Sequence, residues 1–175
     1  IRPTHVFVQG GVGGLAAAVT AHFWELLGTD APAMTIVEPN NAACLLESAR
    51  AGQPRAVEGD LDTIMAGLAC GEPSIIAWPI LRSGASAFMA IPDEAAAETM
   101  RLLASGSAGE RLVGGESGVA GLAGLLVAAE HEDMRRALGL GPHSVVIVFG
   151  SEGDTDPALY RQITGMSGAE AAARI

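Results

Sequence analysis

Lysine is absent from this chain of 175 residues. All ten basic residues are arginine, and with 20 acidic residues the formal net charge is −10. A Walker-type phosphate loop, which needs a Gly-Lys-Ser/Thr sequence, is therefore excluded. The acidic balance also argues against nucleic acid and membrane surfaces as partners, because both are bound by clustered lysine and arginine.

Cysteine is scarce, and long apolar runs are missing. Cys44 and Cys70 are the two cysteines, too few for a disulfide framework or a four-cysteine zinc site. Two cysteines in a chain of this length favour a reducing, cytoplasmic location. No apolar run approaches the roughly 20 residues of a bilayer span, and the four histidines show no metal-ligand spacing.

Apolar residues are plentiful, at 49% of the chain against 17% charged residues, so a substantial core is expected. The length suits one α/β domain over residues 1–175. Apolar runs of strand length alternate with stretches of helical periodicity, which predicts a three-layer parallel sheet with helices on both faces. The expected strands are Thr4–Gln9, Met34–Glu38, Ser74–Trp78, Ala87–Ile91 and Ser144–Phe149. The expected helices are Gly14–Leu27, Asn40–Ala51, Leu61–Leu68, Asp93–Leu103, Gly118–Leu138 and Ala169–Ile175.

The strongest local signal is the stretch Gln9–Ala18, in which four glycines join a strand to an alanine-rich helix. Glycine lets the backbone approach an anion closely, and the N-terminus of a helix adds partial positive charge. This pattern predicts a site for the phosphate of a cofactor or substrate. The alternative is a tight strand–helix turn that binds nothing.

A dinucleotide site is one candidate for that phosphate. Gly11-x-Gly13-x-x-Ala16 satisfies the dinucleotide fingerprint, and Glu38 at the end of the next predicted strand is placed to bind a ribose hydroxyl. A lone match of this kind is weak, and the fingerprint does not account for two further glycines, Gly10 and Gly14.

A larger set of segments points elsewhere. The chain carries, in this order, Gln9–Ala18, Val37-Glu38-Pro39, Thr63–Pro73, Gly115-Glu116-Ser117-Gly118 and Ser151–Asp156. Together they resemble the pyridoxal-phosphate enzymes of the tryptophan-synthase-β type, across nearly the whole chain. The stretches Thr63–Pro73 and Gly150–Asp156 resemble the branch of ammonia-lyases that act on diaminopropionate. The fold implied by this resemblance is a portion of the tryptophan-synthase-β-like large domain.

The resemblance assigns roles to individual residues. The loop that holds the cofactor phosphate through its backbone amides corresponds to Gly11, Val12, Gly13 and Gly14. Ser151 corresponds to the serine or threonine whose hydroxyl meets the pyridine nitrogen of the cofactor, pyridoxal 5'-phosphate. From its position alone, Ser151 is equally an ordinary turn residue after a strand.

Three further residues are expected near the cofactor or substrate. Gly67 lies in the segment that approaches the cofactor edge in relatives, although it also suits close packing. Glu72 follows it closely and is a candidate to face the substrate. Glu116 resembles an acidic residue near the cofactor ring, and it is equally placed to be a carboxylate at a helix start.

The absent lysine then limits what this chain does alone. An enzyme of this type needs a lysine to form the internal aldimine and to move the α-proton. The resemblance places that lysine in the N-terminal half, before the glycine-rich loop. We therefore expect the chain to be the C-terminal portion of a longer enzyme, because it also opens at Ile1 instead of Met with a strand predicted from Thr4 onward, and to be inactive by itself.

The resemblance implies α,β-elimination on 2,3-diaminopropionate, a small amino acid, to give pyruvate and ammonia, by an enzyme that acts as a homodimer. Three alternatives remain: a serine or threonine dehydratase of the same superfamily, a dinucleotide-binding oxidoreductase domain, and a fragment that folds but binds no ligand.

Overall fold

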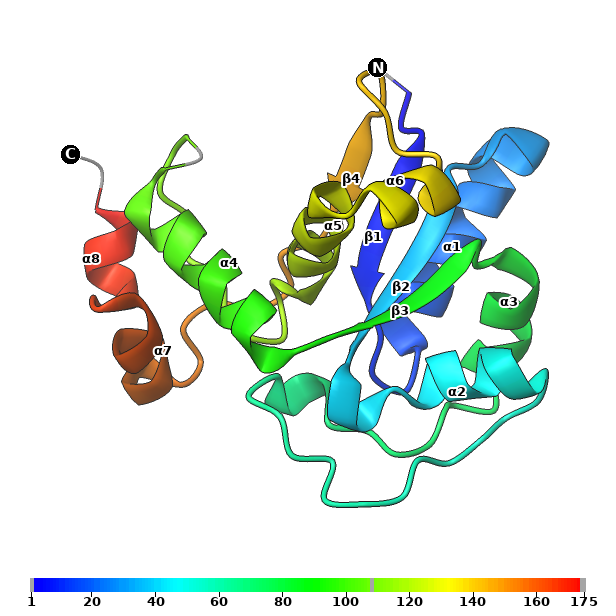
Figure 1. The fold of residues 1–175 in the computed structure, drawn as a ribbon, viewed down its shortest axis with the longest axis horizontal. Helices are drawn as coiled ribbons and strands as arrows, with labels where there is room; N and C mark the ends of the chain where they lie inside the picture. Colours follow the sequence, from blue (N-terminus) through cyan, green and yellow to red (C-terminus); the bar gives the residue numbers. More distant parts are fainter. Residues whose placement is uncertain (1, 108, 174–175) are drawn as a thin grey trace.

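The computed structural model describes residues 2–107 and 109–173, and its centre is a sheet of four parallel strands in the order β3-β2-β1-β4 (Figure 1). The register aligns His5 with Ala33 on one side and with Val146 on the other. The strands are β1 (His5–Gln9), β2 (Ala33–Pro39), β3 (Ala87–Ile91) and β4 (Val146–Val148). The predicted parallel sheet is confirmed, with β4 shorter than expected.

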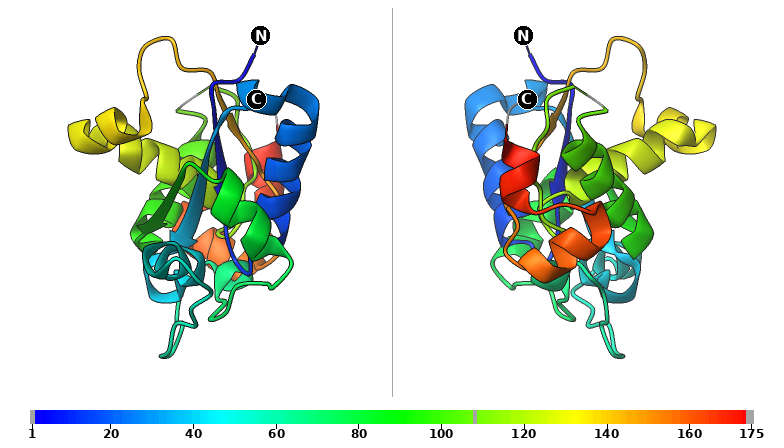
Figure 2. Two further views of the ribbon diagram at one scale, coloured as in Figure 1. Left: turned by 90° about the vertical axis from the view of Figure 1, so that its right-hand side faces the viewer. Right: turned by 90° about the vertical axis from the view of Figure 1, so that its left-hand side faces the viewer.

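Helices cover both faces of the sheet, so the predicted three-layer arrangement is also confirmed (Figures 1 and 2). Side chains alternate along β1, so that Val6 and Val8 pack toward one face and Phe7 toward the other. The first face is covered by α1 (Gly14–Leu27), α2 (Cys44–Ala51) and α3 (Ala77–Gly84). The second is covered by α5 (Ala120–Glu130), and α4 (Asp93–Ser105) packs against α5 in the same apolar cluster.

Two C-terminal helices extend the second layer. Helices α7 (Pro157–Thr164) and α8 (Gly168–Ala172) pack against α4, and their Tyr160 and Ala171 are buried in the core. The side chain of Asp156 caps α7, and Ser167 forms a capping box with Glu170 at α8. The sequence carries both signals, although only α8 was expected, over Ala169–Ile175. Residues 174–175 of that prediction lie outside the described residues.

The strand predicted over Ser74–Trp78 is wrong. The Oγ of Ser74 accepts hydrogen bonds from the N–H groups of Ile76 and Ala77, which turns the chain into α3. Ala77, Trp78 and Leu81 are then buried at helical spacing, while Ile75 and Ile76 stay exposed.

The helix predicted over Leu61–Leu68 is also wrong. Only the short 3-10 turn η3 (Ala66–Leu68) forms there. The carboxylate of Asp93 accepts hydrogen bonds from the hydroxyl of Thr63 at 2.5 Å and from the N–H of Ile64 at 2.9 Å. These tertiary bonds hold the segment extended against the start of α4.

The long helix predicted over Gly118–Leu138 is divided in two. The backbone of His131 is extended, with φ −102° and ψ 116°, and it separates α5 from α6 (Glu132–Leu138). Two further 3-10 turns are η1 (Gly28–Asp30) and η2 (Asn40–Ala42). Among the described residues, no helix has both the length and the apolar character to cross a membrane.

Helix α5 lies unusually close to β1 because glycine stands at the contact. A Cβ at Gly121 would lie 2.7 Å from the carbonyl oxygen of Phe7, a backbone atom of the central strand. We expect G121A to lower the free energy of unfolding by about 2 kcal/mol, because the helix must move off the sheet. Urea unfolding measures this. The control is G141A, where a Cβ would meet nothing within 4 Å, and an equal loss in both variants would contradict the argument.

Candidate functional site

The glycine-rich loop follows β1 at the carboxyl edge of the sheet. A Cβ at Gly10 would lie 2.6 Å from Cγ2 of Ile36, and one at Gly13 would lie 2.9 Å from Cδ1 of Leu81. Gly13 also has φ +98°, in the left-handed region that side chains disfavour. The path of the loop therefore depends on glycine at both positions.

The loop presents its N–H groups with no protein acceptor. The carbonyl oxygens of Gly11 and Val12 accept bonds from Cys44 and Ser74, but within the described residues the N–H groups of Gly11, Val12 and Gly13 donate to none. Helix α1 begins here with no side-chain cap and no acidic residue in its first turn. Unpaired amides at a helix N-terminus form a site for an anion.

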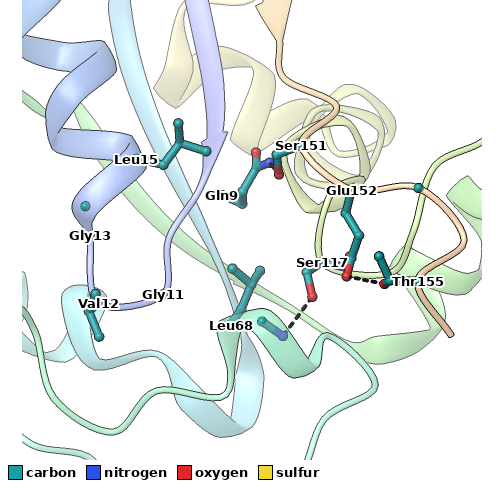
Figure 3. Close-up of a pocket in the computed structure, with 13 residues that line it drawn as sticks. Gln9, Gly11, Val12, Gly13, Leu15, Leu68, Ser117, Ser151, Glu152 and Thr155 are labelled. Atoms are coloured by element: carbon teal, nitrogen blue, oxygen red, sulfur yellow. Dashed lines mark hydrogen bonds between the residues drawn. The ribbon is translucent and has the colours of Figure 1, made fainter.

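A cavity of about 540 Å³ opens beside this loop (Figure 3). Its walls come from the glycine-rich loop, η3, the segment before α5 and the segment after β4. The lining residues are Gln9, Gly11, Val12, Gly13, Gly14, Leu15, Gly67, Leu68, Ser117, Ser151, Glu152, Gly153 and Thr155. The site therefore lies beyond the carboxyl ends of the strands, where open α/β sheets bind ligands.

Ser151 faces the loop across this cavity. Its Oγ lies 2.5 Å from Nε2 of Gln9, the last residue of β1. The same Nε2 lies 3.1 Å from the carbonyl oxygen of Phe149. The buried side chain of Gln9 therefore ties the segment after β4 to the central strand.

Glu152 joins two other walls of the cavity. Its Oε2 accepts hydrogen bonds from the N–H groups of Ser117 at 2.8 Å and Gly118 at 3.1 Å, and its Oε1 accepts from the hydroxyl of Thr155. The Oγ of Ser117 in turn accepts from the N–H of Gly67 at 2.9 Å (Figure 3). This chain of bonds holds segments that are distant in the sequence against one another.

Six of the residues expected near a cofactor line this cavity, namely Gly11, Val12, Gly13, Gly14, Gly67 and Ser151. Glu72 and Glu116 lie outside the lining. Glu72 is exposed, whereas Glu116 is buried, and burial followed by the charges of Glu152 and Asp156 raises its pKa. A role for either acid near the cofactor stays a prediction.

Several residues that line the cavity were not predicted from the sequence. Gln9 carried a signal, because it is a polar residue that directly follows the apolar run Val6–Val8. Ser117, Glu152 and Thr155 stand in the quoted motifs, but no sequence rule indicates that Glu152 reaches back 35 residues to the N–H of Ser117. Within residues 2–107 and 109–173, no cluster of His, Cys, Asp or Glu could hold a metal ion.

Glu38, the candidate ribose ligand of a dinucleotide site, faces away from the cavity. Its side chain is fully buried, and its two carboxylate oxygens accept the N–H groups of Leu45 and Leu46, each at 2.8 Å. Burial raises the pKa of Glu38 to about 8, although these bonds act in the opposite direction. Because Glu38 is buried and both of its carboxylate oxygens accept N–H groups of α2, it is not available to bind a ribose hydroxyl.

Comparison with known proteins identifies the class. The family model described as "Pyridoxal-phosphate dependent enzyme" matches residues 1–150, and this chain belongs to that family. A diaminopropionate ammonia-lyase of Salmonella typhimurium is 42% identical over 169 residues, which cover 92% of this chain and 42% of the relative. The family assignment decides against the dinucleotide alternative.

Solved structures agree. The holo diaminopropionate ammonia-lyase of Escherichia coli matches with a TM-score of 0.86 and 38% identity, over 94% of this chain and 42% of that one. A threonine deaminase of T.th. matches with a TM-score of 0.69 over 87% of this chain and 51% of that one; at 24% identity it shows the shared fold alone. The chain spans less than half the length of the ammonia-lyases it matches.

The geometry fits the family's cofactor, pyridoxal 5'-phosphate. The unpaired N–H groups of the glycine-rich loop suit a phosphate, and a Cβ at Gly14 would meet nothing within 4 Å, so the backbone there faces open space. The exposed Ser151 offers a hydroxyl across the cavity. Both ends of the cofactor therefore have a chemically suitable partner.

Proposed function

We propose that this chain forms the cofactor-binding part of a pyridoxal-phosphate-dependent carbon–nitrogen lyase that converts 2,3-diaminopropionate into pyruvate and ammonia. The proposal rests on one observation: the unpaired N–H groups of the glycine-rich loop and the hydroxyl of Ser151 line the same cavity. The 42% identity to a diaminopropionate ammonia-lyase supports the substrate.

Different residues bind the two ends of the cofactor. The N–H groups of Gly11, Val12, Gly13 and Gly14 bind the phosphate, aided by the N-terminus of α1. The hydroxyl of Ser151 contacts the pyridine nitrogen. When bound, the cofactor supplies an electron sink for the elimination. Because a neutral hydroxyl does not hold the ring nitrogen protonated as a carboxylate would, that sink is milder and suits the expulsion of a β-substituent.

This chain lacks the catalytic lysine of this chemistry. None of its 175 residues is a lysine, so no side chain here forms the link to the cofactor or moves the α-proton. We therefore propose that it is the C-terminal portion of a longer enzyme, acting as a homodimer in the cytoplasm on a small amino acid. The two free cysteines, Cys44 and Cys70, suit a reducing compartment.

A chimera tests the activity. In it, this chain replaces the matched region of the Salmonella typhimurium relative, so that the remainder of the relative completes the enzyme. We expect pyruvate and ammonia from diaminopropionate with added pyridoxal phosphate, and no product from the 175-residue chain alone.

Competing substrates decide between the alternatives. Faster turnover of serine or threonine than of diaminopropionate by the chimera would favour a dehydratase. A folded chimera that binds no pyridoxal phosphate would overturn the proposal and leave the chain as a fragment without a ligand.

A further inference from the structure

Gln9 lines the cavity, but the proposed binding of the phosphate and of the ring nitrogen gives it no role. It is a polar residue directly after the apolar run Val6–Val8 of β1, and it is 4% exposed. Its Nε2 lies 2.5 Å from Oγ of Ser151, 3.1 Å from the carbonyl oxygen of Phe149 and 3.5 Å from that of Gly118.

The two carbonyl groups fix which way this amide faces. A carbonyl oxygen only accepts hydrogen bonds, so the atom turned toward Phe149 and Gly118 has to be the amide nitrogen. The reverse orientation would set Oε1 against two carbonyl oxygens. In the observed orientation Oε1 is buried and accepts no bond from the described residues, a cost that the nitrogen's contacts offset.

The two protons of this amide are then assigned by distance. One is donated to Phe149 and the other to Oγ of Ser151, while the contact to Gly118 lies at the outer limit of a hydrogen bond. Ser151 is consequently the acceptor in its bond with Gln9. Its own hydroxyl proton stays available for an acceptor in the cavity.

We propose that Gln9 is a positioning residue that orients the hydroxyl of Ser151 so that it donates to an unprotonated ring nitrogen of the cofactor. The inference rests on the proposed function, which takes Ser151 as the ring contact. A donor aimed at the nitrogen favours its neutral form and lowers its pKa. Without Gln9 the hydroxyl is free to rotate, and this preference weakens.

Nuclear magnetic resonance of the ¹⁵N-labelled chain tests the bond between Gln9 and Ser151 without any cofactor. We expect S151A to shift one of the two side-chain amide protons of Gln9 and to leave those of the exposed Gln53 in place. Unchanged Gln9 signals in S151A would overturn the inference. The measurement also decides the case if a variant of Gln9 fails to fold.

Binding of pyridoxamine phosphate, which needs no lysine, tests the consequence. In the chimera described above, we compare the wild-type sequence with Q9M, S151A and the double variant, with Q53M as the matched control and circular dichroism as the check on folding. Loss of one oriented hydrogen bond predicts about 3- to 10-fold weaker binding in Q9M. The double variant is expected to bind as S151A does, because no hydroxyl is left to orient.

The outcomes separate the two proposals. Absorbance of the bound ligand against pH is expected to give a higher ring-nitrogen pKa in Q9M than in the wild type. If the wild type binds but Q9M matches it in affinity and pKa, the role of Gln9 is wrong and the proposed function stands. If adding Q9M to S151A weakens binding as much as adding Q9M to the wild type does, Gln9 acts on the fold instead of through Ser151. If the chimera carrying the wild-type chain folds but binds no pyridoxamine phosphate, the proposed function itself fails.

Discussion

Replacing Gly13 with alanine is expected to weaken the binding of pyridoxamine phosphate by about 100-fold, equivalent to about 3 kcal/mol. Alanine at φ +98° is strained, and its Cβ would lie 2.9 Å from Cδ1 of Leu81 and 3.1 Å from Cβ of Ala77. We expect the loop to relieve that strain by a change of backbone path that turns its N–H groups away from the cavity. Isothermal calorimetry with pyridoxamine phosphate, and with inorganic phosphate, measures the loss.

The variant G52A is the control for the effect of backbone strain without a steric contact. Gly52 has φ +68° at the end of α2, and a Cβ there would meet nothing within 4 Å. We expect this variant to lose stability and to keep its affinity for the phosphate. Equal affinities in G13A and the wild type would show that the loop does not hold the phosphate.

The free energy of unfolding is expected to fall as pH rises from about 5 to 8, with Glu38 contributing up to about 1.4 kcal/mol per pH unit. Burial raises the pKa of Glu38 from 4.5 to about 8. Between these values the folded chain keeps a proton that the unfolded chain releases, so a rising pH favours unfolding. Below this range both states are protonated, and Glu38 adds no slope.

Urea unfolding at several pH values checks the effect of Glu38. E38Q removes the titrating group while keeping an oxygen that accepts an N–H of α2, so its stability is expected to vary less with pH than that of the wild type. E25Q changes an exposed glutamate of α1 and is expected to leave the slope as it is. A wild-type slope retained in E38Q would assign the pH dependence to other groups.

Local patterns of apolar residues in the sequence predicted most strands of the sheet and two of the helices that pack around it. The alternation of apolar runs and helical stretches located β1, β2, β3, α1 and α4 to within a few residues. Four glycines after a strand predicted a phosphate-binding loop, and the structure places unpaired N–H groups beside a cavity there, because a close backbone approach leaves a local trace in the sequence.

Predictions failed where long-range contacts decide the structure. Ser74 turns a strand-like apolar run into the start of a helix, and the carboxylate of Asp93 holds the segment of Thr63 and Ile64 extended. The hydrogen bond between Gln9 and Ser151 could not be predicted for the same reason, since Ser151 lies 142 residues further along the chain. Pairings over such distances have no local signature.

The order of the strands has a consequence for synthesis on the ribosome. β1 is central in the finished sheet, but its pairing with β4 begins where Thr4 meets Val145, 141 residues later. On the side of β1 that β4 occupies, the backbone groups of β1 therefore meet their native partner only after Val146–Val148 has been synthesised. Within this chain, closing that side of the sheet is a late step of folding, because it depends on a contact of high sequence separation.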